Sequence, residues 1–254
     1  MDDFSVNQDE GALPPIVFAP RQGEPRQLFV LLHDDESTPA QLDALTLALK
    51  QAFPQSLVVL PYGPLRSPEG VHRWVEPDGP GQDNRASRIR RALLPLVVLV
   101  QRLQRQYGLD SEGTALAGFG MGATLALEAV NAQLDLAGRV LAFSGCYAQL
   151  PGIAPPATTL HLLHGQEDAI VPVADARGAH AHLADLKGDA TLDIASQVGH
   201  ELHEVLVRQA IYRLQTCVPL RSWQAALGEL RDLAAQEPDA SSDGPETPPD
   251  RTLH

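Results

Sequence analysis

Short apolar runs alternate with longer helical patterns along most of this chain, and this alternation constrains the fold more than any other feature. The runs predicted to form strands are 16–19, 28–32, 57–60, 114–117, 140–143, 159–163 and 191–195. Near-continuous apolarity is typical of strands buried on both faces, as in a parallel sheet. Helical patterns cover about 39–53, 84–107, 122–133, 173–187, 201–216 and 220–236. The sequence therefore predicts an α/β fold, with a mostly parallel central sheet and helices on both faces.

Two prolines mark features of the predicted helices. Thr38 precedes Pro39, and a capping residue followed by proline at the first helical position is typical of a helix start. Pro95 falls inside the pattern at 84–107, where proline removes a backbone donor, so we expect a kink there.

The chain of 254 residues suits one such domain, which we place at residues 13–236. Residues 1–12 form a flexible acidic N-terminus, and residues 237–254 form an acidic tail rich in Pro and Ser that is predicted to be disordered. These two end segments carry most of the net charge of −13, so the domain itself is only mildly acidic.

Composition excludes several classes of partner. A mildly acidic surface is a poor match for nucleic acid, and the arginines of the second predicted helix are interpreted as a solvated face. No apolar run reaches the roughly 18 residues that a membrane span requires. The acidic N-terminus lacks the basic region of a signal peptide, and Cys146 and Cys217 make no disulfide framework. We expect a cytoplasmic protein, and the sequence leaves a homodimer open.

Polar and glycine-rich motifs follow the predicted strands, at the sheet edge where α/β proteins bind ligands. In chain order these motifs are His-Asp-Asp-Glu at 33–36, His-Arg-Trp at 72–74, Gly-Phe-Gly-Met-Gly at 118–122, His-Gly-Gln-Glu-Asp-Ala-Ile-Val-Pro at 164–172 and Gly-His at 199–200. Each motif is weak evidence by itself, and their order and placement make the pattern specific.

This series resembles the small bacterial carboxylesterase/phospholipase family of α/β-hydrolases, the serine esterases, from about Leu28 to Leu214. The resemblance implies an α/β-hydrolase fold and hydrolysis of small acyl esters or thioesters through an acyl-enzyme, without cofactor or metal. The catalytic acid of the family matches Asp168, and its catalytic histidine matches His200. The chain order nucleophile, acid, histidine is that of α/β-hydrolases.

The nucleophile of the family is missing. A Gly-x-Ser-x-Gly elbow presents a serine hydroxyl on a strained turn between strand and helix, and Gly120 stands at the serine position here. Glycine tolerates the strained backbone but has no oxygen that could attack a carbonyl.

The turn that forms the oxyanion hole departs as well. The family has His-Gly-x-Gly, whereas residues 33–36 read His-Asp-Asp-Glu. By position, the backbone N–H groups of Asp35 and Met121 would hold the oxyanion. Three carboxylates beside a developing negative charge would disfavour it unless they point to water.

Other residues at the strand ends can be interpreted as functional or as structural. Trp74 is predicted to line the mouth of the substrate pocket, with a core aromatic as the alternative. His33 and His164 are interpreted as structural. The stretch from His200 to Glu204 lacks the histidine pair of a His-Glu-x-x-His zinc site, so no metal is expected.

Four interpretations of the altered elbow stay open. A pseudo-hydrolase would bind a small acyl ester or a partner without cleaving it. A water activated by His200 could sustain residual hydrolysis. Ser144 or Cys146, at the end of the neighbouring strand, could act as a relocated nucleophile. The pattern Gly118-x-Gly120-x-x-Ala123 also fits a dinucleotide-binding turn, although the acid expected after strand 140–143 is absent.

Overall fold

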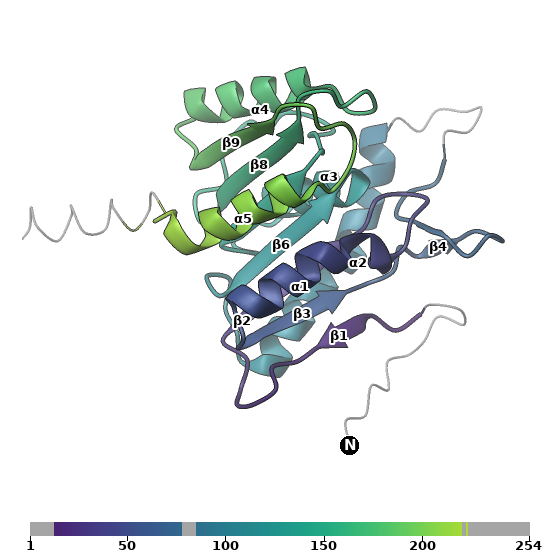
Figure 1. The fold of residues 1–254 in the computed structure, drawn as a ribbon, viewed down its shortest axis with the longest axis vertical. Coiled ribbons are helices and arrows are strands. Elements are labelled where there is room, and N and C mark those ends of the chain that lie inside the picture. Colours follow the sequence, from purple (N-terminus) through teal and green to yellow (C-terminus); the bar gives the residue numbers. More distant parts are fainter. Residues whose placement is uncertain (1–12, 78–84, 220–221, 223–254) are drawn as a thin grey trace, which may run out of the picture. The chain divides into compact units, whose positions relative to one another are not determined.

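A computed structural model describes residues 13–77, 85–219 and 222 (Figure 1). Within this part of the chain, a 7-stranded sheet has the order β1-β3-β2-β6-β7-β8-β9. Only β1 runs antiparallel to its neighbour, and the other pairs are parallel. The strands are β1 (Ile16–Phe18), β2 (Gln27–Leu32), β3 (Ser56–Leu60), β6 (Thr114–Phe119), β7 (Arg139–Phe143), β8 (Thr159–Gly165) and β9 (Ala190–Ala195). The predicted fold class is confirmed.

Helices cover both faces of this sheet. On one face, α1 (Asp43–Ala52) and α5 (Glu204–Thr216) share an apolar cluster with the side chains of the strands. On the other face, α2 (Arg85–Tyr107), α3 (Met121–Ala132) and α4 (Val173–Asp185) contribute to a second cluster. The central strand β6 supplies side chains to both clusters, as expected for a strand that is buried on both sides.

Some boundaries differ from the predictions. The helix predicted from 39 begins with a short 3-10 segment, η1 (Pro39–Leu42), and the Thr38 side chain makes no capping bond. The helix predicted from 201 begins at Glu204, because the ring of His203 accepts a hydrogen bond from the N–H of Val205 at 3.2 Å and caps it. Helix α2 continues through Pro95, and the kink stays a prediction.

A small hairpin of β4 (Leu65–Arg66) and β5 (His72–Arg73) was not predicted. Its strands are two residues long, too short to show any hydrophobic period. The predicted helix at 220–236 and both predicted end segments, 1–12 and 237–254, lie outside the described residues. Among the helices that the structure does describe, none combines the length and the apolarity needed to cross a membrane.

Leu116 lies at the centre of β6 and is fully buried, so it tests the role of this strand. We expect Leu116→Ala to lower the free energy of unfolding by about 2–5 kcal/mol, because it removes apolar contacts and leaves a cavity. Leu94→Ala is the matched control, since Leu94 on α2 is 70% exposed and should change stability by no more than about 0.5 kcal/mol. Urea denaturation measures both, and equal losses would contradict the assigned core.

Candidate active site

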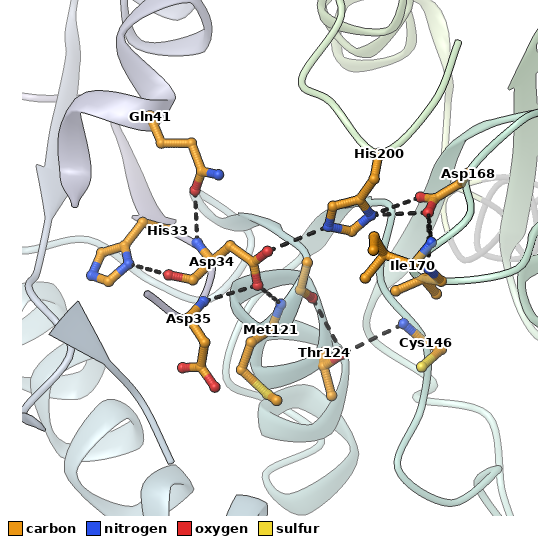
Figure 2. A network of polar contacts seen from close by, with 12 residues as sticks. His33, Asp34, Asp35, Gln41, Met121, Thr124, Cys146, Asp168, Ile170 and His200 are labelled. Carbon is orange, nitrogen blue, oxygen red and sulfur yellow. Dashed lines mark hydrogen bonds and ion pairs between the residues drawn. The ribbon is translucent and has the colours of Figure 1, made fainter. Parts of the chain in front are cut away.

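The motifs that follow β2, β6, β8 and β9 come together at one edge of the sheet (Figure 2). Gly120 lies between β6 and α3 with φ 56° and ψ −116°, a conformation that L side chains rarely adopt. The flanking Gly122 permits a close approach, because a Cβ there would lie 2.1 Å from the carbonyl oxygen of Leu32. The sharp turn typical of a nucleophile elbow is therefore present, with glycine at its central position.

His200 and Asp168, predicted as the catalytic histidine and acid, lie in direct contact. The Nδ1 atom of His200 is 3.0 Å and 2.9 Å from the two carboxylate oxygens of Asp168. The same carboxylate accepts hydrogen bonds from the N–H groups of Ile170 and Val171 at 2.9 Å and 2.8 Å. These contacts fix the orientation of the imidazole, so that Nε2 points toward the carboxylate of Asp34 (Figure 2).

The environment of Asp168 favours its ionised form. Burial by itself raises the pKa of this carboxyl, but the N–H groups of Val171 and Ile170 and the ring of His200 together hold the pKa below its ordinary value. His164 lies behind the acid, with Nε2 2.8 Å from the carbonyl oxygen of Val171 and 3.4 Å from Asp168. His164 thus contacts the loop that carries the acid, in keeping with its structural interpretation.

Asp34 occupies the centre of the site, and sequence reasoning did not single it out. Its Oδ1 atom accepts hydrogen bonds from the N–H of Met121 at 2.6 Å and from the N–H of Asp35 at 2.9 Å (Figure 2). The two donors expected to form an oxyanion hole therefore converge on one oxygen, and that oxygen belongs to the protein. The other oxygen, Oδ2, lies 3.3 Å from Nε2 of His200.

The Asp34 carboxylate also fills the space that a side chain at position 120 would need. A Cβ built on Gly120 would lie 2.3 Å from Cγ, 2.3 Å from Oδ1 and 2.4 Å from Oδ2 of Asp34. Real Cβ atoms essentially never approach another atom so closely. A serine at position 120 and the Asp34 carboxylate in its present place exclude each other.

Both ring nitrogens of His200 face a carboxylate, and this arrangement suits the protonated imidazole, in which both are donors. The hydrogen bond to Asp34 raises the pKa of His200 most, burial opposes it, and Asp168 raises the pKa further, so the net shift is upward. The resting site is thus an array of carboxylate, imidazole and carboxylate that favours the protonated ring.

The turn that carries Asp34 is braced from several sides. The side chain of Gln41 accepts a hydrogen bond from the N–H of Asp34 at 2.8 Å. Nδ1 of His33 lies 2.6 Å from the carbonyl oxygen of Asp34, while Nε2 accepts from the N–H of Gly63 at 3.0 Å. His33 is fully buried and, as interpreted from the sequence, serves the turn structurally.

Trp74 takes part in this bracing and lies away from the catalytic cavity. Its indole N–H donates to the carbonyl oxygen of His33 at 2.7 Å, and its backbone N–H donates to the carboxylate of Asp35 at 2.7 Å. Its side chain lines a separate cavity of about 300 Å³ beside α2. Trp74 therefore lines a cavity other than the one that His200 lines, and its place at the mouth of the substrate pocket stays a prediction.

The three acids of the turn have different surroundings. The side chain of Asp35 is held by Trp74, and burial raises its pKa despite that hydrogen bond. Glu36 forms an ion pair with Arg73. Asp34 alone turns inward to the two backbone donors, so the condition that all three acids point to water is not met.

A cavity of about 310 Å³ opens beside the array. Besides Asp34 and His200, its walls include Thr124, Cys146 and Val171, and Arg85 and Asp175 add one charge of each sign. Its size suits a small ligand.

The two alternative nucleophiles lie nearby but do not engage the histidine. Ser144 is fully buried, and within the described residues its hydroxyl makes no hydrogen bond. Cys146 lines the cavity, and its backbone N–H donates to Thr124 at 3.4 Å. No hydrogen bond joins either side chain to His200 in the described part of the chain. The described part of the chain also contains no group of three or more His, Cys, Asp or Glu side chains that could hold a metal ion.

The sequence did carry a signal for Asp34. Two departures from the family pattern, aspartate for glycine at 34 and glycine for serine at 120, fall in motifs that meet at the same strand ends. Read as a pair, they exchange a hydroxyl on one turn for a carboxylate on the next. Backbone position alone could not show that the aspartate points inward.

Comparison with known proteins identifies relatives of this fold and site. The sequence profile of the phospholipase/carboxylesterase family matches residues 15–218. The chain is 35% identical to esterase YpfH of Escherichia coli (strain K12) over 204 residues, which span 80% of this chain and 88% of that protein.

Solved structures of esterases share this fold. Esterase PE8 superposes with a TM-score of 0.70 at 26% identity, over 82% of this chain and all of that one. A carboxylesterase from Mesorhizobium loti superposes with a TM-score of 0.65 at 15% identity, over 76% of this chain and 90% of that one, a likeness of fold alone.

The contact between Asp34 and His200 can be tested by titration. We expect the pKa of His200 to lie above its ordinary value of about 6.5 and to fall in Asp34→Asn, because the amide removes the negative charge that stabilises the imidazolium. NMR titration of the ring protons measures this, with assignment by loss of the signal in His200→Gln. Glu36→Gln is the control, since it removes a carboxylate of the same turn that pairs with Arg73.

The same contact makes stability depend on pH. A group whose pKa is raised on folding stabilises the fold below its unfolded pKa of about 6.5, and this contribution is lost as pH rises through the folded value. The stability difference between the native protein and Asp34→Asn should therefore be larger near pH 6 than near pH 9. An unchanged His200 pKa in Asp34→Asn would contradict the assigned contact.

Proposed function

Because the chain belongs to the phospholipase/carboxylesterase family, we propose that its site derives from one that hydrolyses small acyl esters or thioesters, and that the acyl-serine route is closed here. Hydrolysis of such esters is weak or silent. One observation carries this proposal. The Asp34 carboxylate fills both the space of the missing serine side chain and the oxyanion hole.

An acyl-enzyme needs a hydroxyl at the elbow and two free backbone donors for the developing negative charge. Gly120 offers no hydroxyl, and both donors are engaged by Oδ1 of Asp34. Hydrogen bonds to a charged group contribute about 1.5–3 kcal/mol each, so a neutral ester carbonyl competes poorly for these donors. Serine hydrolases that lack one triad member still accelerate the reaction about 10³–10⁴-fold over water, through the oxyanion hole and substrate binding. In this site the oxyanion hole is occupied, so its part of that acceleration is lost.

The water-assisted route meets the same obstacle. A water activated by His200 would have to lie beside Nε2, and that nitrogen faces Asp34 at 3.3 Å. Residual hydrolysis therefore requires the Asp34 side chain to move.

A non-catalytic role, binding a small acyl ester or a related ligand, is the second candidate. It is favoured by the cavity of about 310 Å³, which persists beside the altered elbow with polar and charged groups on its walls. Dinucleotide binding is disfavoured by the same carboxylate. Asp34 holds the N–H of Met121 at the start of α3, where a pyrophosphate would have to sit, and would repel it. We further propose a cytoplasmic location, with no nucleic-acid partner. A homodimer stays a prediction.

Restoring the serine alone should not restore the enzyme. We expect Gly120→Ser to hydrolyse p-nitrophenyl acetate and butyrate no better than the native protein, because the new side chain meets the Asp34 carboxylate. The double variant Asp34→Gly/Gly120→Ser should gain at least about 10²-fold over the single variant, since it restores both the nucleophile and the two donors. His200→Ala added to the double variant should abolish that gain.

A matched control comes from the same turn. Glu36→Gly/Gly120→Ser also removes an acid, at a position whose φ of 55° suits glycine, but leaves Asp34 in place and should stay inactive. A serine-directed phosphonate should label the double variant at position 120 and leave the native protein unlabelled. A stoichiometric phosphonate adduct on a serine of the native protein would overturn the proposed function.

A further inference from the structure

The two oxygens of the Asp34 carboxylate differ in their surroundings. Oδ1 accepts short hydrogen bonds from Met121 and Asp35, whereas Oδ2 has, among the described residues, only the longer contact to Nε2 of His200 at 3.3 Å. The side chain is 24% exposed and lines the cavity of about 310 Å³. Oδ1 is thus anchored by two hydrogen bonds, while Oδ2 keeps lone pairs available toward the cavity.

A carboxylate held in this way suits attack on a saturated carbon. Carboxylates act as covalent nucleophiles in several enzyme classes. Displacement at an sp³ carbon places the developing negative charge on the leaving group, so this step needs no free oxyanion hole. The feature that closes the acyl-serine route therefore does not hinder alkyl transfer.

We propose that Asp34 is the nucleophile of a hydrolytic alkyl-transfer reaction, acting on short primary alkyl substrates that carry a halide leaving group. This inference rests on the proposed function, because it requires the acyl-serine route to be closed. In the first step Oδ2 forms a bond to the carbon, the carbon–halogen bond breaks, and halide departs with the electron pair. The product is an alkyl ester of Asp34.

The rest of the site supplies the second step. Once Oδ2 carries the alkyl group it no longer accepts a hydrogen bond from Nε2 of His200, and the alkylated side chain has to draw back from the 3.3 Å contact to admit a water. That water loses a proton to Nε2 of His200 and attacks Cγ of Asp34, while Asp168 holds the ring in place. Negative charge then develops on Oδ1, where Met121 and Asp35 already donate. The tetrahedral intermediate collapses, the alcohol leaves with the proton from His200, and the carboxylate is regenerated. Alkyl halide and water become alcohol, halide and a proton.

The charge state of His200 fits this order of events. In the resting site both ring nitrogens face carboxylates, which favours the protonated ring, and the hydrogen bond to Asp34 is the main cause of its raised pKa. Alkylation neutralises Asp34 and removes that cause. The neutral ring, which the second step requires as a base, is then favoured.

The cavity accommodates the remaining parts of such a substrate. Val171 and Pro172 offer apolar wall to a short alkyl chain. Arg85 lines the same space and carries a guanidinium that can stabilise the departing anion. Gly120 leaves room for the nucleophile, because any Cβ there would overlap the carboxylate.

A trapping experiment tests the covalent step. His200→Gln cannot activate water, so incubation of the full chain with 1-bromobutane should release one bromide per chain and then stop. Mass spectrometry should find a butyl group on the peptide that contains Asp34. The native protein should instead turn over, and Asp34→Asn should release bromide only at the background rate. Glu36→Gln, in the same turn, should match the native protein.

Isotope labelling tests the hydrolytic step. In a single turnover in H₂¹⁸O, the attacking water oxygen should enter the Asp34 carboxylate, and the butanol should carry oxygen from the protein. This outcome distinguishes the mechanism from direct attack of water on the substrate. Label found only in butanol would overturn the proposal, as would butylation confined to Cys146 or Cys217, or no adduct on Asp34 in His200→Gln.

Failure of this inference and failure of the proposed function are separable. Absence of a butyl ester on Asp34 overturns the inference and leaves the ester measurements untouched. Vigorous, phosphonate-sensitive hydrolysis of p-nitrophenyl esters by the native protein overturns the proposed function, whatever the result with 1-bromobutane.

Discussion

The site depends on one interaction: a single carboxylate oxygen of Asp34 accepts hydrogen bonds from two backbone N–H groups. It ties the turn after β2 to the first residue of α3 and sets the second oxygen against His200. The raised pKa of His200 follows from the same contact, as does the occupied oxyanion hole. In serine hydrolases these donors stabilise a negative charge that develops only during the reaction. Here the carboxylate of Asp34 already accepts hydrogen bonds from both donors.

The scaffold around this contact is that of the phospholipase/carboxylesterase family. The elbow keeps its positive φ at Gly120, the acid and histidine keep their mutual hydrogen bonds, and the donors keep their convergence. The proposed change of chemistry rests on side chains at two positions, Asp34 and Gly120. The family assignment explains the framework, and function has to be argued from the side chains that the framework carries.

Most of the fold could be predicted from the sequence, because buried parallel strands and amphipathic helices leave strong periodic signals. The strands predicted at 28–32 and 140–143 lie within one residue of β2 and β7. The partnership of Asp168 and His200 followed from motif order. The inward rotation of Asp34 could not be predicted, because it depends on the empty space at Gly120 and on Gln41 and His33, which brace the turn. The sequence left the role of Trp74 open, because an aromatic at a strand end fits a pocket wall and a brace equally well.

The mutual exclusion between a side chain at 120 and the carboxylate at 34 also orders the steps by which such a site can arise. With a serine at the elbow, an aspartate at 34 could not lie where it lies here without shifting its carboxylate away from the added Cβ. If the site derives from a serine enzyme, as proposed, loss of the side chain at 120 makes room and the carboxylate then gains its hydrogen bonds. Reversal of that order would need a change at both positions, because either substitution alone leaves the other residue in the way.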